Sequence, residues 1–128
     1  MIVANWKANG DIKKNYLWCE TFQNLLDKSS FNYVGISPSH IHFHQLNTFF
    51  KETNVMIGMQ DIYIEGGAIT GSISAEMASA DGCSFCLVGH SERREIFNED
   101  GNLISKKISS LLKNNIKPIL CIGESFEE

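Results

Sequence analysis

The sequence predicts an α/β fold built on a parallel sheet, and three observations carry this prediction. Short apolar runs of strand length alternate along the 128-residue chain with stretches of helical period. Most of these runs are continuously apolar, which is typical of parallel strands buried on both faces. Each run ends in polar residues. The order β-α-β-α-β-α-β-α-β predicts one domain, residues 1–128, with right-handed crossovers between its strands.

The five expected strands are the most clearly bounded elements. They are Ile2–Ala4, Tyr33–Ile36, Val55–Met59, Phe85–Val88 and Ile119–Ile122. Gly and Pro lie largely at the joints between them and the helices, where turns are expected.

The helical patterns differ in strength. Residues 13–27 and 102–115 predict amphipathic helices, and residues 40–51 and 75–80 are weaker candidates. The apolar positions of the two clear helices are Tyr16, Leu17, Phe22, Leu25 and Leu26, and then Leu103, Ile104, Ile108, Leu111 and Leu112. A further helix is expected to begin at Ser91. Ser39 and Asp100 are plausible N-cap residues.

Bulk composition narrows the function classes. The net charge of -4 and the pI of about 5.5 favour neither nucleic acid nor an anionic membrane as a partner. No apolar run approaches the roughly 18 residues of a transmembrane helix. The N-terminus has no basic segment followed by an apolar one, so no signal peptide is predicted. A cytoplasmic protein is therefore expected.

Two architectures fit five parallel strands with covering helices: an open doubly wound sheet and part of a (β/α)8 barrel. Both place their chemistry at the C-terminal ends of the strands. The turn after the first strand has no GxGxxG, which an open dinucleotide-binding sheet would usually carry. The rim formed by the strand ends contains Asn5-Trp6-Lys7, Ser37-Pro38-Ser39, Gln60-Asp61, Gly89-His90-Ser91-Glu92 and Gly123-Glu124-Ser125.

Lys7 and His90 are the rim residues best suited to chemistry. A Lys beside a neutral His can polarise a substrate carbonyl or stabilise an enediolate oxygen. The helix expected from Ser91 would keep His90 neutral near pH 7, because its dipole disfavours added positive charge. Glu92 suits the first turn of that helix and could neutralise Lys7. A lone His after a strand is, on residue type alone, more often a cap or a surface residue.

Three other patterns have weaker functional interpretations. Cys83 and Cys86 have CxxC spacing, but residues three apart on a strand face opposite sides and no second CxxC completes a zinc site. All four cysteines are expected to be reduced and buried, as small hydrophobic residues. The Gly-rich loop Asp61–Gly71 lacks the Lys and the spacing of a phosphate loop. The histidines of His40-x-His42-x-His44 are expected to lie on a solvated helix face rather than to bind zinc.

Specific strings of the chain resemble the triosephosphate isomerase family. They are Ala4-Asn5-Trp6-Lys7, Val88-Gly89-His90-Ser91-Glu92-Arg93-Arg94 and Cys121-Ile122-Gly123-Glu124, together with the loop Gly67-Ala68-Ile69-Thr70-Gly71. They stand in the family's order and at roughly its spacing, and the resemblance covers the whole chain. It implies a TIM barrel, incomplete here, with about the first five strands and their helices.

The resemblance also implies a function. The family interconverts dihydroxyacetone phosphate and D-glyceraldehyde 3-phosphate through an enediolate, as part of glycolysis and gluconeogenesis, with no cofactor and no metal. The implied roles are substrate binding by Asn5 and Lys7, catalysis by Lys7 and His90, support by Ser91, Glu92, Cys121 and Gln60, and contact with a second subunit of a homodimer by Thr70.

The chain departs from the family pattern in length. A TIM barrel takes typically about 250 residues, and the family's catalytic base is a glutamate at the end of the sixth strand, which has no counterpart here. Residues 1–128 alone are therefore expected to be inactive, and to be poorly folded or self-associating because of open strand edges. Ser72 stands where the family usually has an acidic residue. The alternative function is a non-catalytic fragment that binds a phosphate ester or a protein partner.

Overall fold

The computed structural model describes residues 1–26 and 33–123. Its elements are β1 (Ile2–Asn5), α1 (Ile12–Leu25), β2 (Val34–Ser37), η2 (His40–His42), α2 (Phe43–Phe49), β3 (Met56–Met59), α3 (Ala75–Ala80), β4 (Phe85–Val88), α4 (Ser91–Phe97), α5 (Gly101–Lys113) and β5 (Lys117–Leu120). The predicted alternation of strands and helices is confirmed.

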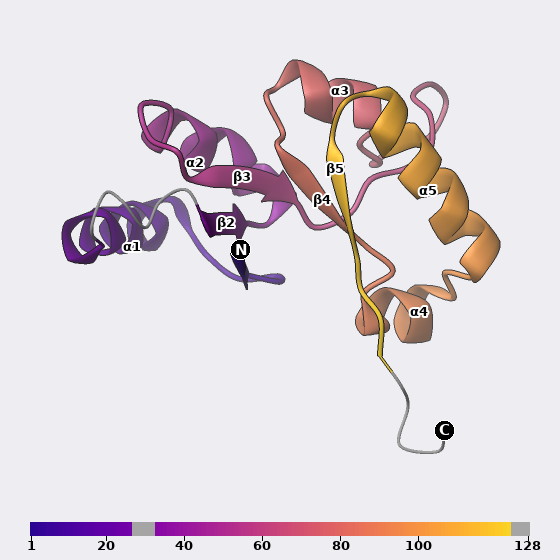
Figure 1. Cartoon of the computed structure of the whole chain (residues 1–128), viewed down its shortest axis with the longest axis horizontal. Coiled ribbons are helices and arrows are strands. Elements are labelled where there is room, and N and C mark those ends of the chain that lie inside the picture. The colour runs from indigo at the N-terminus through magenta and orange to yellow at the C-terminus, as the bar shows by residue number, and fades with distance from the viewer. Residues whose placement is uncertain (27–32, 124–128) are drawn as a thin grey trace.

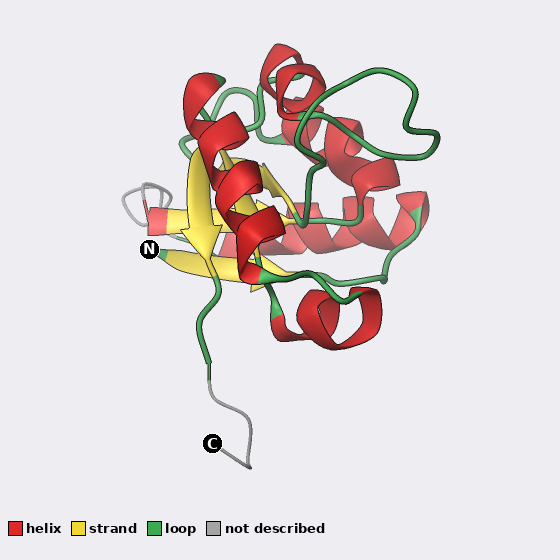
Figure 2. Ribbon diagram, turned by 90° about the vertical axis from the view of Figure 1, so that its right-hand side faces the viewer, coloured by secondary structure: helices red, strands yellow, loops and turns green. Residues whose placement is uncertain are grey.

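The sheet decides between the two expected architectures. All four strand pairs are parallel, and the spatial order β1-β2-β3-β4-β5 is the order along the chain. A doubly wound sheet reverses its strand order at a switch point, and this sheet does not. The five strands form a curled half-barrel with helices on its outer side (Figures 1 and 2). The fold is therefore an incomplete (β/α)8 barrel.

The main core lies between the sheet and the helices. Ile36, Ile57, Cys86 and Val88 contribute from the strands. Phe85 and Leu87 alternate with Cys86 and Val88, so they face the concave side, and both are buried. At the margins of the sheet the apolar residues Ile2, Leu120 and Ile122 are exposed. The centre of the half-barrel is thus packed, and its margins are not.

The fifth strand begins two residues earlier than predicted and contains Pro118. The backbone amides of Lys117 and Cys121 donate to Ser84 and Val88 on and beside β4. Successive residues of a strand point their backbone N–H groups to opposite sides. Pro118 lies between residues that donate to β4, so its nitrogen, which carries no hydrogen, faces the free edge of the sheet. The prediction from the apolar run, Ile119–Ile122, is therefore shifted by two residues relative to the observed strand.

Helix α1 confirms the position of the first predicted helix but not its buried face. Tyr16, Leu17 and Leu25 are exposed, and the buried residues are Asn15 and Cys19. Residue 27 lies outside the described residues. The mixed spacing of the apolar residues left the face undetermined. In α5 the predicted positions Ile104 and Leu111 are buried, whereas Leu112 is exposed.

Caps explain where several helices begin. Asp100 confirms its predicted role, because its Oδ1 accepts the Leu103 amide at 2.8 Å. Ser39 precedes η2 without a side-chain cap bond, so this prediction is only half right. Asp11 caps α1 by accepting the Lys14 amide. Among the described residues, no helix is long and apolar enough to cross a membrane.

Candidate active site

Lys7 has an unusual backbone conformation that its neighbours hold in place. Its φ is 53°, in the left-handed region that residues with a Cβ rarely adopt. Its amide donates to Asn5 Oδ1 at 3.0 Å, and its carbonyl accepts from Gln60 Nε2 at 2.8 Å. Gln60 also donates to the Ser37 carbonyl at 3.0 Å. The ends of β1, β2 and β3 therefore cooperate to position one lysine.

The Glu92 carboxylate lies between Lys7 and His90. Glu92 Oε1 lies 2.5 Å from Lys7 Nζ, and Glu92 Oε2 lies 3.4 Å from His90 Nδ1. The hydrogen bond from Lys7 holds the pKa of Glu92 below its ordinary value. Both partners of the Lys7–Glu92 pair are well exposed to solvent. The structure thus brings together the two residues that the sequence singled out, together with Glu92.

His90 is the N-cap of α4, and this sets its tautomer. Its Nδ1 accepts the Glu92 backbone amide at 3.3 Å. A ring nitrogen that accepts a hydrogen bond carries no proton, so the proton of the neutral ring is on Nε2. Gly89 just before it has a φ of 68°, which turns the chain from β4 into α4. The arrangement leaves Nε2–H as the donor that His90 can offer to a ligand.

The remaining predicted site residues lie at different distances from this centre. Ser91 is exposed at the start of α4, and Thr70 is exposed on the loop between β3 and α3. Cys121 was expected to be buried and is only half-buried, because it follows β5 at the edge of the sheet. Glu124 and Ser125 lie outside the described residues.

Sequence reasoning missed a ring of four charged side chains, of which Glu99 and Lys107 are buried and Arg93 and Asp61 are partly buried. Arg93 lies 2.6 Å from Glu99 and 3.0 Å from Asp61, measured between the nearest nitrogen and oxygen atoms. Lys107 Nζ closes the ring at 2.7 Å from Glu99 and 2.6 Å from Asp61. The sequence did contain a sign of this ring, because Lys107 falls on the apolar face of α5, between Ile104 and Leu111. A charge at such a position needs a buried partner.

Burial acts in opposite ways on the two carboxylates of this ring. It raises the pKa of Asp61 above its ordinary value, against the pull of Lys107 and Arg93. It would raise the pKa of Glu99 as well, but the hydrogen bonds from Lys107 and Arg93 outweigh it and lower that pKa.

Replacement of Glu99 by Gln is expected to destabilise the fold by about 2 kcal/mol at neutral pH, because a charge-assisted bond to Lys107 becomes a neutral one. A lowered folded-state pKa means that the Glu99 contribution is present above the unfolded value of about 4.3 and is lost as pH falls through the folded value. The urea unfolding midpoints of the unsubstituted protein and of Glu99→Gln, measured from about pH 7 to about pH 3, should therefore converge in acid. Asp61 is unchanged in both proteins, so its own titration does not cause the two midpoints to converge. A constant difference between the two midpoints across this pH range would contradict the lowered pKa of Glu99.

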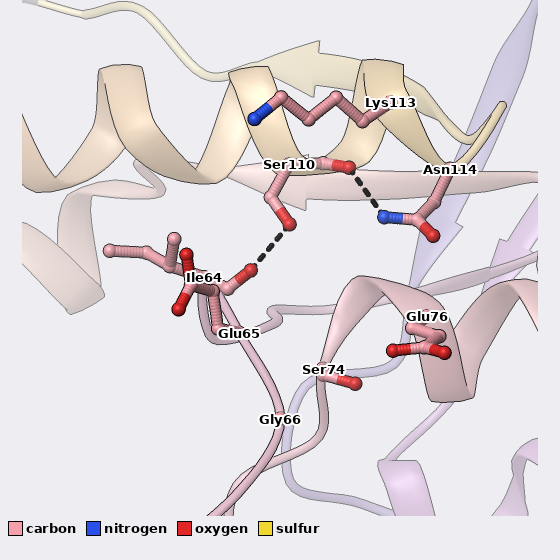
Figure 3. A pocket seen from close by; sticks show the side chains of 8 residues that line it. All are labelled: Ile64, Glu65, Gly66, Ser74, Glu76, Ser110, Lys113 and Asn114. Carbon is pink, nitrogen blue, oxygen red and sulfur yellow. Dashed lines mark hydrogen bonds between the residues drawn. The ribbon is translucent and has the colours of Figure 1, made fainter.

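Among the described residues, four cavities lie away from Lys7 and His90, and the two smaller ones contain hydrogen-bonded or ion-paired side chains of α5. One, of about 210 Å³, is lined by Ile64, Glu65, Gly66, Ser74, Glu76, Ser110, Lys113 and Asn114 (Figure 3). There Ser110 donates to the Ile64 carbonyl, and Asn114 donates to the Ser110 carbonyl. The other, of about 330 Å³, adjoins the charge ring and includes His40. Neither shares a lining residue with the Lys7–His90 site.

The metal interpretations gain no support. Residues 1–26 and 33–123 contain no group of three or more His, Cys, Asp or Glu residues able to hold a metal ion. Cys83 precedes β4 and is not part of it. The expectation that Cys83 and Cys86 face opposite sides of one strand therefore does not apply. Burial raises the pKa of Cys83 to about 11, which keeps it a thiol.

The expectation of three solvated histidines is wrong in part. His42 is buried, with its Nε2 3.3 Å from the Gly10 carbonyl, and only His44 is fully exposed. His40 Nε2 is buried without a hydrogen-bond partner in the structure, and burial lowers the pKa of His40. The sequence could not show this, because the segment is a 3-10 turn that packs against the loop after β1.

The chain is similar over its whole length to proteins of one family. The sequence model of the triosephosphate isomerase family matches residues 1–128. Curated proteins named triosephosphate isomerase are 39% identical in Aquifex aeolicus, 36% in Alkaliphilus oremlandii and 33% in Legionella pneumophila strain Paris. Each alignment covers 100% of this chain and 52% of the relative. The chain therefore spans about half the length of the curated relatives it matches.

Proposed function

Because this chain belongs to the triosephosphate isomerase family, we propose that its strand ends supply part of a site that interconverts dihydroxyacetone phosphate and D-glyceraldehyde 3-phosphate. The observation that carries the proposal is the placement of Lys7 and His90 around Glu92, whose carboxylate pairs with Lys7 Nζ at 2.5 Å and whose backbone amide donates to His90 Nδ1 at 3.3 Å. Two side chains that follow different strands thereby lie close together on one rim.

The proposed chemistry follows from the charges at the rim. A base removes a proton from the substrate carbon next to the carbonyl, and the electron pair moves onto the carbonyl oxygen to form an enediolate. The Lys7 ammonium stabilises this negative charge and that of the phosphate. The Nε2–H of His90 donates to the same oxygen and moves a proton between the two enediolate oxygens. Asn5 contributes to substrate binding.

The base is proposed to come from outside the residues described. Glu92 is held by Lys7 and is ill-suited to take a proton from carbon, since its pKa is lowered. In the family, the base is a glutamate after the sixth strand. No cofactor is needed for this reaction, and none is proposed. The cytoplasmic location stays a prediction.

A homodimer is proposed as the assembly that carries the site. Thr70 is exposed on the loop between β3 and α3, where it could reach a second subunit. Ser72 on the same loop lacks the acidic side chain usual in the family, so the loop would be braced differently.

The test is a fusion protein, in which residues 1–128 are joined to the part of the Aquifex aeolicus relative that this chain does not cover. The fusion protein is expected to convert glyceraldehyde 3-phosphate, measured by a coupled assay, while residues 1–128 alone are expected not to. The second half supplies the missing base and covers the open edges of β1 and β5.

The alternative, a non-catalytic module that binds phosphate esters, predicts a different result. A folded fusion protein without turnover, combined with saturable binding of a phosphate ester to residues 1–128, would favour it. Turnover by residues 1–128 alone, lost on His90→Gln, would contradict the assignment of the base to another segment.

A further inference from the structure

Helix α4 carries the reactive end of the site, yet its own packing is weak. It has seven residues, from Ser91 to Phe97, and none of them is buried. Isolated helices of this length are unstable in water, and helices in proteins are usually held by a buried apolar face. Since α4 lacks such a face, polar contacts must hold it.

Two arginines supply these contacts. Arg94 Nε donates to the Gly89 carbonyl at 2.7 Å, and its Nη2 donates to the Cys121 carbonyl at 3.4 Å. Arg93 enters the charge ring, with Asp61 on one side and Glu99 on the other. Arg93 directly follows Glu92, so any displacement of Arg93 displaces the residue whose carboxylate pairs with Lys7 and whose amide donates to His90.

Lys107 is the residue that fixes both carboxylates of the ring. Its side chain is 2% exposed, and its ammonium contacts Asp61 after β3 and Glu99 between α4 and α5. Without that ammonium, the buried carboxylate of Glu99 and the partly buried carboxylate of Asp61 would share the single guanidinium of Arg93 and would repel each other. One Glu99 oxygen, Oε2, already lacks a partner in the structure. The position of Arg93 therefore depends on a lysine at the far side of the ring.

We propose that Lys107 is a positioning residue, which acts through Glu99 and Arg93 to hold α4 so that Glu92 and His90 face Lys7. The effect on catalysis rests on the proposed function, whereas the effect on the geometry of His90 does not.

The experiment uses the fusion protein and compares Lys107→Met with Lys106→Met. Both remove an ammonium from α5, but Lys106 is exposed and takes part in none of the ion pairs within residues 1–26 and 33–123. Lys107→Met is expected to lower kcat by about 10- to 100-fold relative to Lys106→Met, because misplacement of catalytic groups by about 1 Å has effects of this size. KM should change less than kcat, and Lys107→Arg should restore part of the activity.

A second readout is independent of turnover. The ¹⁵N chemical shifts of the His90 ring report whether Nδ1 still accepts the Glu92 amide, and they are expected to change in Lys107→Met only. If Lys107→Met does not fold, the double variant Lys107→Met/Glu99→Gln is used instead. The double variant keeps Arg93 paired with Asp61 and leaves the ring with no net charge. A folded variant with unchanged kcat and unchanged His90 shifts would overturn the proposal. A fusion protein that is inactive even with Lys107 would count against the proposed function alone, and the His90 shifts would then decide on the positioning role.

Discussion

His90→Gln in the fusion protein is expected to lower kcat by about 10²- to 10³-fold, the usual effect of removing one preorganised donor to a developing oxyanion. Gln keeps a polar side chain of similar reach, but it cannot move a proton between two oxygens. The N-cap bond from the Glu92 amide to Nδ1 is also lost or altered, although helix formation should survive this change.

The matched control is His44→Gln, because His44 is exposed on α2 and has no place in the proposed site. Steady-state rates of both variants, with circular dichroism to verify folding, make the comparison. Equal kcat values for His90→Gln and the unsubstituted fusion protein would remove His90 from the mechanism.

Gly58→Ala is expected to destabilise the fold by at least about 3 kcal/mol, at the upper end of the range for overpacked cores. A Cβ on Gly58 would lie 2.5 to 2.6 Å from three ring carbons of Phe85. Phe85 is the direct neighbour of Gly58 across the β3–β4 pair, and it is fully buried. The ring also lies 2.8 Å from the Cβ position of Gly35, so it cannot move toward β2.

The test is a double-mutant cycle of urea unfolding midpoints in the fusion protein. Phe85→Leu removes part of the ring volume, so Gly58→Ala should cost much less in that background, and the two changes should be strongly coupled. Gly101→Ala is the control, because nothing lies near its Cβ position and Ala favours a helix. Additive effects of Gly58→Ala and Phe85→Leu would show that the ring is not the obstacle.

The sequence was most informative where the physical cause is local. Strand positions followed from apolar runs, and the N-cap role of Asp100 followed from its residue type before a periodic segment. The rim site could be anticipated because parallel strands bring their C-terminal ends to one edge, so that Lys7 and His90 were expected together. Glu92 was expected near Lys7 for the same reason, and the ion pair between them confirms this.

Local patterns were less informative about which face of an element is buried. The helix stripe through Tyr16, Leu17 and Leu25 is exposed, because irregular spacing allows more than one face and only the neighbouring elements choose between them. The histidines at residues 40 and 42 were assigned to solvent for lack of any sign that a 3-10 turn would bury them.

By itself, the sequence determined the alternation of strands and helices, the parallel sheet and the set of polar residues at its rim, since each depends on residues close together in the chain. Only the tertiary structure decided the sequential strand order, the left-handed backbone of Lys7 and the ring that joins Asp61 and Lys107. The physical reason is distance along the chain: Lys107 and Asp61 are 46 residues apart, and no local pattern identifies either as the partner of the other. The role of a buried charge or of a close-packed glycine depends on the residue that folding places against it. Hydrophobic periodicity does not identify that residue.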